Sequence, residues 1–509
     1  MLKLNGELTF GHRKLVIDVP ENTQAMTLSG TTVKKGFMYA YLFDANQRLR
    51  GCQLWQKAPK HLTLTTHKAS LGGIVGELPA GEWQLHIYNL EGEERTPKAM
   101  QYLCEVECEV ECEVECEVEC EGAFEPQPEP NDLMGLESLT PSLTADNIIA
   151  FDYSKVKRME SAWYSGDLHA HTCLSDGHNS LAAATEIIKQ QGLDFFFLTE
   201  HNICHPQLPD LDEVLMLPAV EVTTDKGHFN VHGPKRGLDM RDADYSSAAL
   251  IQQGLSLMDD EQKAGGAQGS ISINHPMMKP WHWHYNDMEL AKVNTLEVCC
   301  DPTWATSPQA TEEALTVLSA MWNAGHRIAG VGGSDAHLAP HERNPQAHEP
   351  SLYGDPTTYV YAHGLSGESI LAGLRAGQVY FERGCGLAFE INQGDMLPGQ
   401  AITSPMVTYR LSVEDEFHDY FVELIAGGKV VGSYPLKAHC DGVTEFSLDM
   451  TDHAWLRLDI RRAGRQQNDR EFIGLINPVF NPSFPQFLNP TLATWGELVD
   501  TLNPQNFNK

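Results

Sequence analysis

Histidines and carboxylates follow hydrophobic segments unusually often in the middle of this chain. The segments are DLHAHTCLSDG, TEHN, AVEVTT, HFNVHG, SINHP and GSDAH. The residues of interest in them are His169, His171, Asp176, His201, Glu221, His228, His232, His275, Asp335 and His337. Imidazoles and carboxylates without thiolates are ligands that Zn, Mn and Fe accept, and they disfavour an iron–sulfur cluster. The pattern therefore predicts a metal centre.

The spacing of two of these histidines suits a shared ion. His169 and His171 are two residues apart, so on an extended chain both side chains point to the same side. His228 and His232 share a strand face in the same way, and either could contribute a ligand. One such pair is weak evidence in a chain with 22 histidines. The prediction depends on the joint pattern, because nearly every expected strand ends in a residue of metal-ligand type.

The elements that must position these residues alternate between strands and helices from residue 161 to 385. Expected strands are WYSGDLH, DFFFLTEH, MLPAVEV, HFNVHG, SISINHP, NTLEVCC, RIAGVGGSD and QVYFER. Expected helices are NSLAAATEIIKQQG, SSAALIQQGLSLMDDEQKAGG, SPQATEEALTVLSAMWNAG and GESILAGLRAG. This alternation predicts an α/β domain with mostly parallel strands. In a barrel, such strand ends converge at one face, which would bring the candidate ligands together.

The flanking segments have a different character. Residues 1–121 predict a β-sandwich-like domain, 122–160 an acidic, proline-rich linker, 386–480 a second β-domain and 481–509 a tail. The sandwich ends in a Cys-Glu-Val-Glu repeat at 104–121, which alternates with the period of a strand. We interpret the repeat as the last sandwich strand lengthened by duplication. Soft-metal binding by its cysteines is the alternative.

Composition limits the classes of protein. The chain has 509 residues, with 36 basic against 69 acidic side chains and a net charge of -33. A basic surface for long nucleic acids is therefore not expected. No apolar run is long enough to span a membrane and no signal-peptide pattern opens the chain, so we expect a cytoplasmic protein without a membrane partner. The absence of CxxC pairs favours reduced thiols. The oligomeric state is left open.

The motifs DLHAHTCLSDG, TEHN, AVEVTT with a following GH, NHP and GSDAH resemble, in this order, those of the PHP (polymerase and histidinol phosphatase) superfamily. The resemblance covers residues 161–385. The flanking phrases GELPAGEW and GLINPVFNP are similar to the CehA/McbA-like metallohydrolase branch. The resemblance implies a distorted (β/α)7 PHP barrel flanked by N-terminal and C-terminal β-sandwich-like domains.

The resemblance also implies a trinuclear site for three divalent ions, Zn, Mn or Fe. His169, His171, Glu221 and Asp335 would hold the first ion. Glu221 would bridge to a second ion, which His228 and His275 also hold, with His232 as the alternative to His228. Asp176, His201 and His337 would hold the third ion. Every ligand position of the motif set contains a competent residue.

Charge then indicates the chemistry. Three divalent ions and three carboxylates leave the pocket positive by about three charges, which favours an anion such as a phosphate ester. We predict a metal-dependent phosphoesterase for a small-molecule phosphate ester. Its nucleophile would be a metal-bridging hydroxide, and no general acid is assigned. A carboxyl-ester or carbamate hydrolase with the same metals is one alternative, and a non-catalytic binding or scaffold protein is another. Lys279 and Trp281 are candidates for substrate binding.

Overall fold

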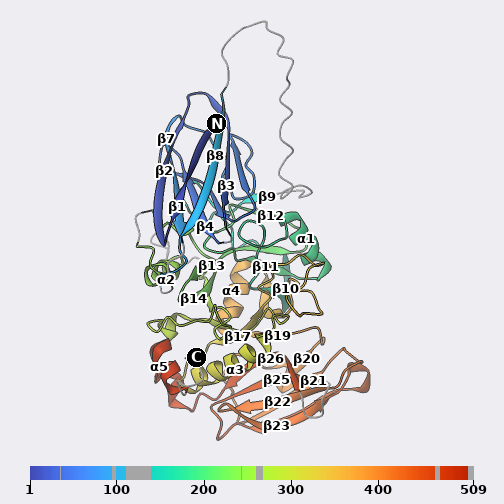
Figure 1. The fold of residues 1–509 in the computed structure, drawn as a ribbon. Coiled ribbons are helices and arrows are strands. Elements are labelled where there is room, and N and C mark those ends of the chain that lie inside the picture. Colours follow the sequence, from blue (N-terminus) through green and yellow to red (C-terminus); the bar gives the residue numbers. More distant parts are fainter. Residues whose placement is uncertain are drawn as a thin grey trace.

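The computed structural model describes residues 1–34, 36–93, 99–110, 139–241, 244–258, 268–464 and 470–502. In these residues, strands outnumber helices (Figure 1). No helix of the described residues is long and apolar enough to cross a membrane. The molecule is elongated, with a strand-rich region at each end and most helices in the middle.

The N-terminal region is a sandwich of two four-stranded antiparallel sheets, in the orders β1-β8-β3-β6 and β2-β7-β4-β5. The strands are β1 (Leu2–Leu8), β2 (Gly11–Val19), β3 (Thr23–Thr32), β4 (Met38–Phe43), β5 (Leu49–Trp55), β6 (Lys60–Thr65), β7 (Gly81–Asn89) and β8 (Met100–Val110). Trp55 and Trp83 are fully buried in the core between the sheets. Along β8, Cys104 and Val106 are buried while Glu105 and Glu107 face outward, so the start of the repeat is a sandwich strand. The rest of the repeat, 111–121, lies outside the described residues.

A mixed sheet of 13 strands forms most of the rest of the molecule, in the order β17-β16-β15-β14-β13-β11-β10-β18-β19-β26-β25-β22-β23. Its first part contains β10 (Arg158–Asp167), β11 (Phe195–Leu198), β13 (Leu215–Thr224), β14 (Gly227–His232), β15 (Ser270–Ile273), β16 (Thr295–Cys300), β17 (Ala329–Gly333), β18 (Thr357–Leu365) and β19 (Val379–Glu382). The remaining strands are β22 (Tyr420–Ala426), β23 (Lys429–Leu436), β25 (Trp455–Ala463) and β26 (Arg470–Phe480).

This sheet curves until its first strand lies beside strands from its middle. The Thr358 hydroxyl of β18 bonds the backbone of Gly332 on β17, and the Asn477 amide of β26 bonds the backbone of Gly330. Three helices pack against the curved part: α1 (Leu181–Gln190), α3 (Ser307–Asn323) and α4 (Gly367–Ala376). A fourth, α2 (Ser247–Ser256), lies over β13. The described residues do not show seven successive βα units of a (β/α)7 barrel.

The main difference from the predicted parallel arrangement is at β14. Strands β13, β14 and β15 pair antiparallel, whereas β10-β11-β13 and β15-β16-β17 pair parallel. Only two residues, Asp225 and Lys226, separate β13 from β14. A connection this short permits a hairpin, because a parallel crossover needs a dozen or more residues.

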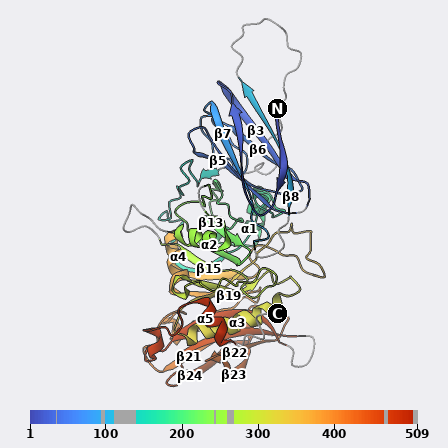
Figure 2. The same ribbon diagram turned by 60° about the vertical axis from the view of Figure 1, so that its left-hand side comes forward.

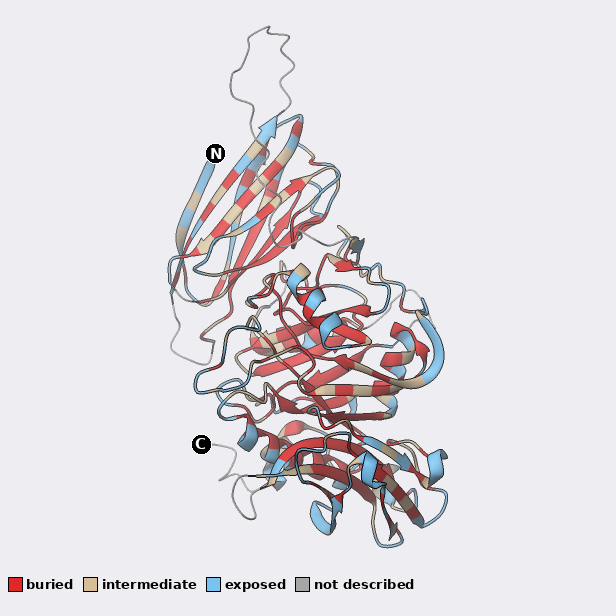
Figure 3. Ribbon diagram, turned by 90° about the vertical axis from the view of Figure 1, so that its right-hand side faces the viewer, coloured by how far each residue is buried: buried red, intermediate tan, exposed pale blue. Residues whose placement is uncertain are grey.

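The C-terminal strands continue the same sheet and are covered by a second, three-stranded one. The order of the small sheet is β20-β21-β24, from β20 (Ala388–Ile391), β21 (Met406–Ser412) and β24 (Thr444–Asp449). The core between them includes Val407, Leu411 and Ile460. The last helix of the described residues, α5 (Trp495–Thr501), packs near α3 (Figure 2). Burial is continuous through the central strands (Figure 3). The exact domain boundaries stay a prediction.

Two short strands, β9 (Leu139–Pro141) and β12 (Gln207–Pro209), form a separate ribbon beside the central region. Residues 139–157 therefore have a defined path over the surface. Ser142 donates hydrogen bonds through its backbone to Pro206 and through its hydroxyl to His205. The part of the predicted linker at 122–138 lies outside the described residues.

Candidate metal centre

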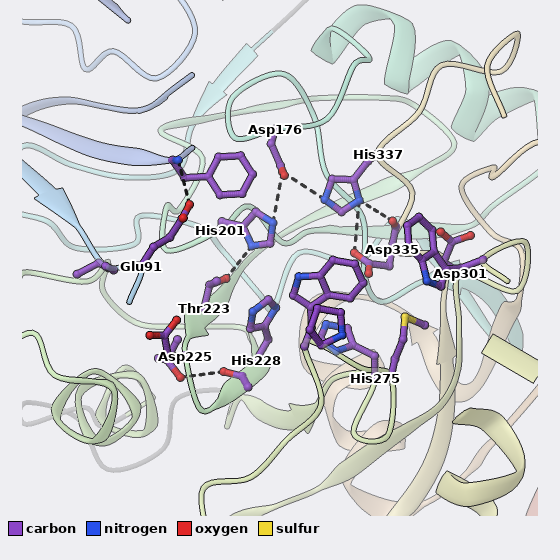
Figure 4. A pocket seen from close by; sticks show the side chains of 18 of the residues that line it. Glu91, Asp176, His201, Thr223, Asp225, His228, His275, Asp301, Asp335 and His337 are labelled. Carbon is purple, nitrogen blue, oxygen red and sulfur yellow. Dashed lines mark hydrogen bonds and ion pairs between the residues drawn. The ribbon is translucent and has the colours of Figure 1, made fainter. Parts of the chain in front are cut away.

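The predicted ligands lie at or just beyond the ends of strands in the curved sheet. His169, His171 and Asp176 follow β10, and His201 follows β11. Glu221 and His228 lie on the hairpin β13–β14, His275 follows β15, and Asp335 and His337 follow β17. The curvature brings the first and last of these segments together. The amide of Asp335 donates a hydrogen bond to the carbonyl of His169 at 2.7 Å. Six segments of the chain thus meet in one place (Figure 4).

Glu221 is the centre of this cluster. Its carboxylate is fully buried. Atom Oε1 lies 3.1 Å from His169 Nε2, 3.2 Å from His228 Nδ1 and 3.5 Å from His275 Nε2. Atom Oε2 lies 2.6 Å from His201 Nδ1. A carboxylate with imidazoles at both oxygens has the arrangement that a bridging ligand requires.

Two further carboxylates extend the cluster toward the surface. Asp335 Oδ1 lies 3.2 Å from His169 Nε2 and 3.1 Å from His171 Nε2. Asp176 Oδ1 lies 3.3 Å from His201 Nε2 and 3.2 Å from His337 Nε2. All nine predicted ligand residues are therefore brought together.

Four overlapping groups of side chains in the described residues have ligand atoms within 4.8 Å of one another. They are His169 with His171 and Glu221; His201 with Glu221 and His228; His171 with Asp176, His201 and His337; and His169 with Cys300 and Asp335. These buried groups could hold metal ions. Cys300, whose thiol lies 3.6 Å from Asp335 Oδ2, was not among the predicted residues.

The charges of the cluster favour cations. Burial alone would raise the pKa of Glu221, but the charges of His201, His169 and His228 hold that pKa well below its usual range. Burial would lower the pKa of His201, but Asp176 and Glu221 raise it well above 6.5. In the part of the chain that the structure describes, no lysine or arginine pairs with Asp176, Glu221 or Asp335. The donor set therefore fits divalent ions, which would take the place of imidazole protons.

The backbone is strained where the strands end at this cluster. Asn202, His275, Asp301 and Asp335 have positive φ angles, of 53°, 28°, 31° and 47°. Left-handed backbone is unfavourable for residues other than glycine, by about 1–3 kcal/mol each, and such strain clusters at functional sites. The surrounding structure stabilises these angles and so fixes the directions of the side chains.

Glu297 on β16 holds two of the predicted ligand residues in place. Its Oε1 accepts a hydrogen bond from His169 Nδ1 at 3.0 Å, and its Oε2 accepts from the amide of His275 at 2.8 Å. The contact depends on Gly333, because a Cβ there would lie 2.2 Å from Glu297 Oε1. Sequence reasoning missed Glu297, which lies inside the strand NTLEVCC and has no distinctive spacing.

Glu200 supports the loop between His171 and Asp176. It accepts hydrogen bonds from the amides of Thr172 and Ser175 and from His205 Nε2. Burial alone would raise the pKa of Glu200, but the hydrogen bond and charge of His205, the charge of His171 and the hydroxyl of Ser175 lower it to about 2. His205 is thus a buried partner of Glu200 that does not line the cavity.

The alternatives at β14 have different surroundings. His228 contacts Glu221, whereas His232 is fully buried and its Nε2 donates to the carbonyl of Leu168 at 2.7 Å. The geometry favours His228 over His232 as a ligand.

Among the substrate-binding candidates, Trp281 lines the cavity described below, whereas Lys279 is exposed and does not line it.

A cavity of about 640 Å³ opens directly onto the cluster. Asp176, His201, His228, His275, Asp335 and His337 all line it. The N-terminal sandwich forms part of its wall through Phe37, Tyr39, Leu90, Glu91 and Gly92. Figure 4 shows Glu91 and Asp225 on one side of the histidines and Asp301 on the other. The cavity is large enough for a small molecule beside the ions.

No family model matches the chain, and no curated protein matches it. Several solved structures are similar to it. A two-domain protein from Bacteroides vulgatus ATCC 8482, described as containing a predicted PHP-like metal-dependent phosphoesterase, covers 61% of this chain and 94% of its own, with 14% identity and a TM-score of 0.33. A periplasmic inhibitor of g-type lysozyme from Aeromonas hydrophila covers 21% of this chain and 85% of its own, with 10% identity and a TM-score of 0.15. Function is therefore inferred from the site itself.

Proposed function

We propose that this protein is a metal-dependent hydrolase of the PHP type that acts on a small phosphate ester. The observation that carries the proposal is the assembly of nine histidine and carboxylate side chains, six of which line one cavity. In this proposal the curved sheet is a distorted PHP barrel, and the expected small-molecule substrate and cytoplasmic location remain part of it.

The cluster offers three places for an ion. His169, His171, Glu221 and Asp335 would hold the first, and Glu221, His228 and His275 the second. Asp176, His201 and His337 would hold the third. When bound, divalent ions supply Lewis acidity toward an ester oxygen and make water more acidic.

The chain's own residues would bind and orient the ester. Glu297 and Glu200 keep the imidazoles and the 172–175 loop in place. Phe37 and Tyr39 of the sandwich and Leu338 beyond β17 exclude water from one side of the cavity. Such preorganisation holds the ester next to the ions, where low polarity strengthens every electrostatic interaction.

Hydrolysis of a carboxyl ester or carbamate is the second candidate. It is favoured by the apolar part of the cavity wall, which includes Met278, Trp281 and Trp304, and by the absence of lysine and arginine among the lining residues that the structure describes. An uncharged ester would need no cation apart from the ions.

The test compares 4-nitrophenyl phosphate with 4-nitrophenyl acetate on protein of measured metal content. We expect phosphate release, and we expect His169→Ala to lower it by at least about a hundredfold because a ligand of the bridged pair is lost. His418→Ala, at an exposed histidine, is the matched control. Acetate turnover alone, lost in His169→Ala, would favour the second candidate. No turnover of either ester would contradict both.

A further inference from the structure

Asp301 is a carboxylate beside the metal centre that none of the predicted ion sites uses. It directly follows β16, just as His275 and Asp335 follow the neighbouring strands β15 and β17. Its φ of 31° is in the left-handed region, as in those two residues. Asp301 lines the cavity on the side of Asp335 and His337 (Figure 4).

Neutral groups hold this carboxylate in a fixed orientation. Asn344 Nδ2 donates to Asp301 Oδ2 at 2.7 Å, and the Thr303 hydroxyl donates to Oδ1 at 2.9 Å. Within the described ranges, no lysine or arginine forms an ion pair with Asp301. These amide and hydroxyl donors carry no net charge, so a ligand with positive charge could still pair with the carboxylate.

Two tryptophans, Trp281 and Trp304, line the same cavity as Asp301. The rings of Trp281 and Trp304 are 5.7 Å apart and inclined at 68°, so they form an aromatic corner of the cavity. The turn after β16 fixes Trp304, whose amide donates to the carbonyl of Asp301 at 2.9 Å. Trp281 is 40% exposed at the cavity wall. Aromatic faces beside a carboxylate attract ammonium groups through the negative face of each ring and through direct charge.

The remainder of the cavity adds no attraction for a second anion. Its opposite side contains Glu91 and Asp225, and the lining residues in the described part of the chain include no lysine or arginine. Among the described lining residues, positive charge would therefore have to come from ions at the bottom. The cavity is therefore polarised, with an end for an anion at the ions and an end for a cation or an apolar group at the tryptophans.

We propose that Asp301, Trp281 and Trp304 form a selectivity subsite, which binds a cationic apolar group of the substrate and rejects a second anionic group. The inference rests on the proposed function in one respect, because it places the substrate's phosphate at the ions. These three residues would determine which phosphate esters bind. Nucleoside polyphosphates and bisphosphates would be disfavoured, and esters with a single anionic group would be preferred.

The test measures binding without turnover. Isothermal titration calorimetry on the metal-loaded full chain would use three benzylphosphonates with a trimethylammonium, a tert-butyl or a carboxylate group in the para position. The first two have the same shape and differ only in charge. We expect the trimethylammonium compound to bind about tenfold more tightly than the tert-butyl compound, and the carboxylate compound about tenfold more weakly.

Asp301→Asn should bring the two isosteres within about twofold of each other, because the charge is lost while the hydrogen-bonding shape remains. Asparagine also tolerates left-handed backbone, so the turn should be retained. Glu186→Gln on α1, the same change of charge outside the cavity, should leave the ratio unchanged. Trp304→Ala should weaken the binding of the trimethylammonium compound more than the binding of the other two compounds.

Equal binding of the three compounds, a preference that persists in Asp301→Asn, or no binding at all would overturn the inference. Phosphonates are not hydrolysed, so this result does not depend on the nitrophenyl assay. Phosphate hydrolysis without charge selectivity would leave the proposed function standing and remove only the subsite.

Discussion

His228 and His232 share a face of β14 but have different partners, and this difference can be tested. His228 contacts Glu221 at 3.2 Å, whereas His232 donates to a backbone carbonyl. We predict that His228→Ala lowers the metal content by about one ion per chain, because it removes a ligand of the second ion. His232→Ala should keep its metal and lower the free energy of unfolding by about 1–3 kcal/mol, because Leu168 loses a buried donor.

Metal analysis after gel filtration and urea unfolding of both variants would measure these effects. Each variant serves as the control for the other, since both remove a buried imidazole from the same strand. If His232→Ala loses an ion and His228→Ala does not, His232 and not His228 is the ligand.

Glu297 is predicted to act through His169 without contacting an ion. Glu297→Gln would replace the carboxylate that accepts from His169 Nδ1 with a weaker, neutral acceptor. We expect metal affinity about 10–100-fold lower, the usual effect of losing such a partner. Competition with a chromogenic chelator would measure the affinity. Glu289→Gln, at an exposed glutamate paired with Lys292, should bind metal like the unaltered protein. Unchanged affinity in Glu297→Gln would contradict the positioning role.

The sequence predicted the candidate ligands because they share one property, a position at the end of a hydrophobic strand. That property does not depend on the exact path of the chain, so residues far apart in sequence, such as His169 and Asp335, could be assigned to one site. Glu297 has no such property. Its neighbours in the strand are apolar, and its role follows from a contact with His169 across 128 positions. Asp301 ends the same strand and could have been found by the same rule.

At the level of elements, the hydrophobic pattern of the sequence predicted some strands and helices and missed others. Strands such as FFFL of β11 and helices such as α3 have clear patterns and lie where expected. The strand β18, with its alternating TTYVYAHGL, was missed although it pairs with both β10 and β19. The antiparallel course of β14 was also missed, because pairing direction follows from the short β13–β14 turn and not from composition.

The pairing of β2 with β7 makes the sandwich sensitive to acid. His12 Nε2 and His86 Nδ1 are 3.0 Å apart across this pair. Burial, together with the charge of His12, lowers the pKa of His86 from 6.5 to about 4. The unfolded chain therefore binds a proton at His86 between these pH values and the folded chain does not. Stability contributed by the neutral ring is lost as the pH falls from 6.5 to about 4.

The unaltered protein should lose free energy of unfolding as the pH falls from 6.5 to about 4. We predict that His86→Gln makes this loss smaller by about 1 kcal/mol, a value reduced for partial solvent screening. Urea unfolding followed at about pH 7, 5.5 and 4.5 would measure the slope in both proteins. His61→Gln, at an exposed histidine of β6 in the same sandwich, should keep the full slope. An equal slope in His86→Gln would show that other groups cause the acid sensitivity.

At the level of the whole molecule, the N-terminal sandwich contributes to the candidate site. The ring of Phe37 stacks on that of His201, with centroids 6.3 Å apart. The amide of Gly92 donates to Asp225 Oδ2, on the turn before His228. A sandwich that only flanked the candidate site would make no such contacts. The cavity thus lies between the N-terminal sandwich and the curved sheet.

The contact that best tests this coupling is made by Tyr41 on β4. Its hydroxyl donates to the carbonyl of Asn202 at 2.6 Å, and Asn202 has strained backbone next to His201. Tyr41→Phe keeps the ring and removes only this bond, so we predict a loss of about 1 kcal/mol in stability. We also predict about tenfold weaker binding of the most labile ion, because His201 is less well fixed. Tyr102→Phe removes a comparable bond to Arg13 inside the sandwich and should change stability alone. Chelator titration of the two variants separates the possibilities: if both retain metal equally, the sandwich shapes the cavity without holding the ligands in place.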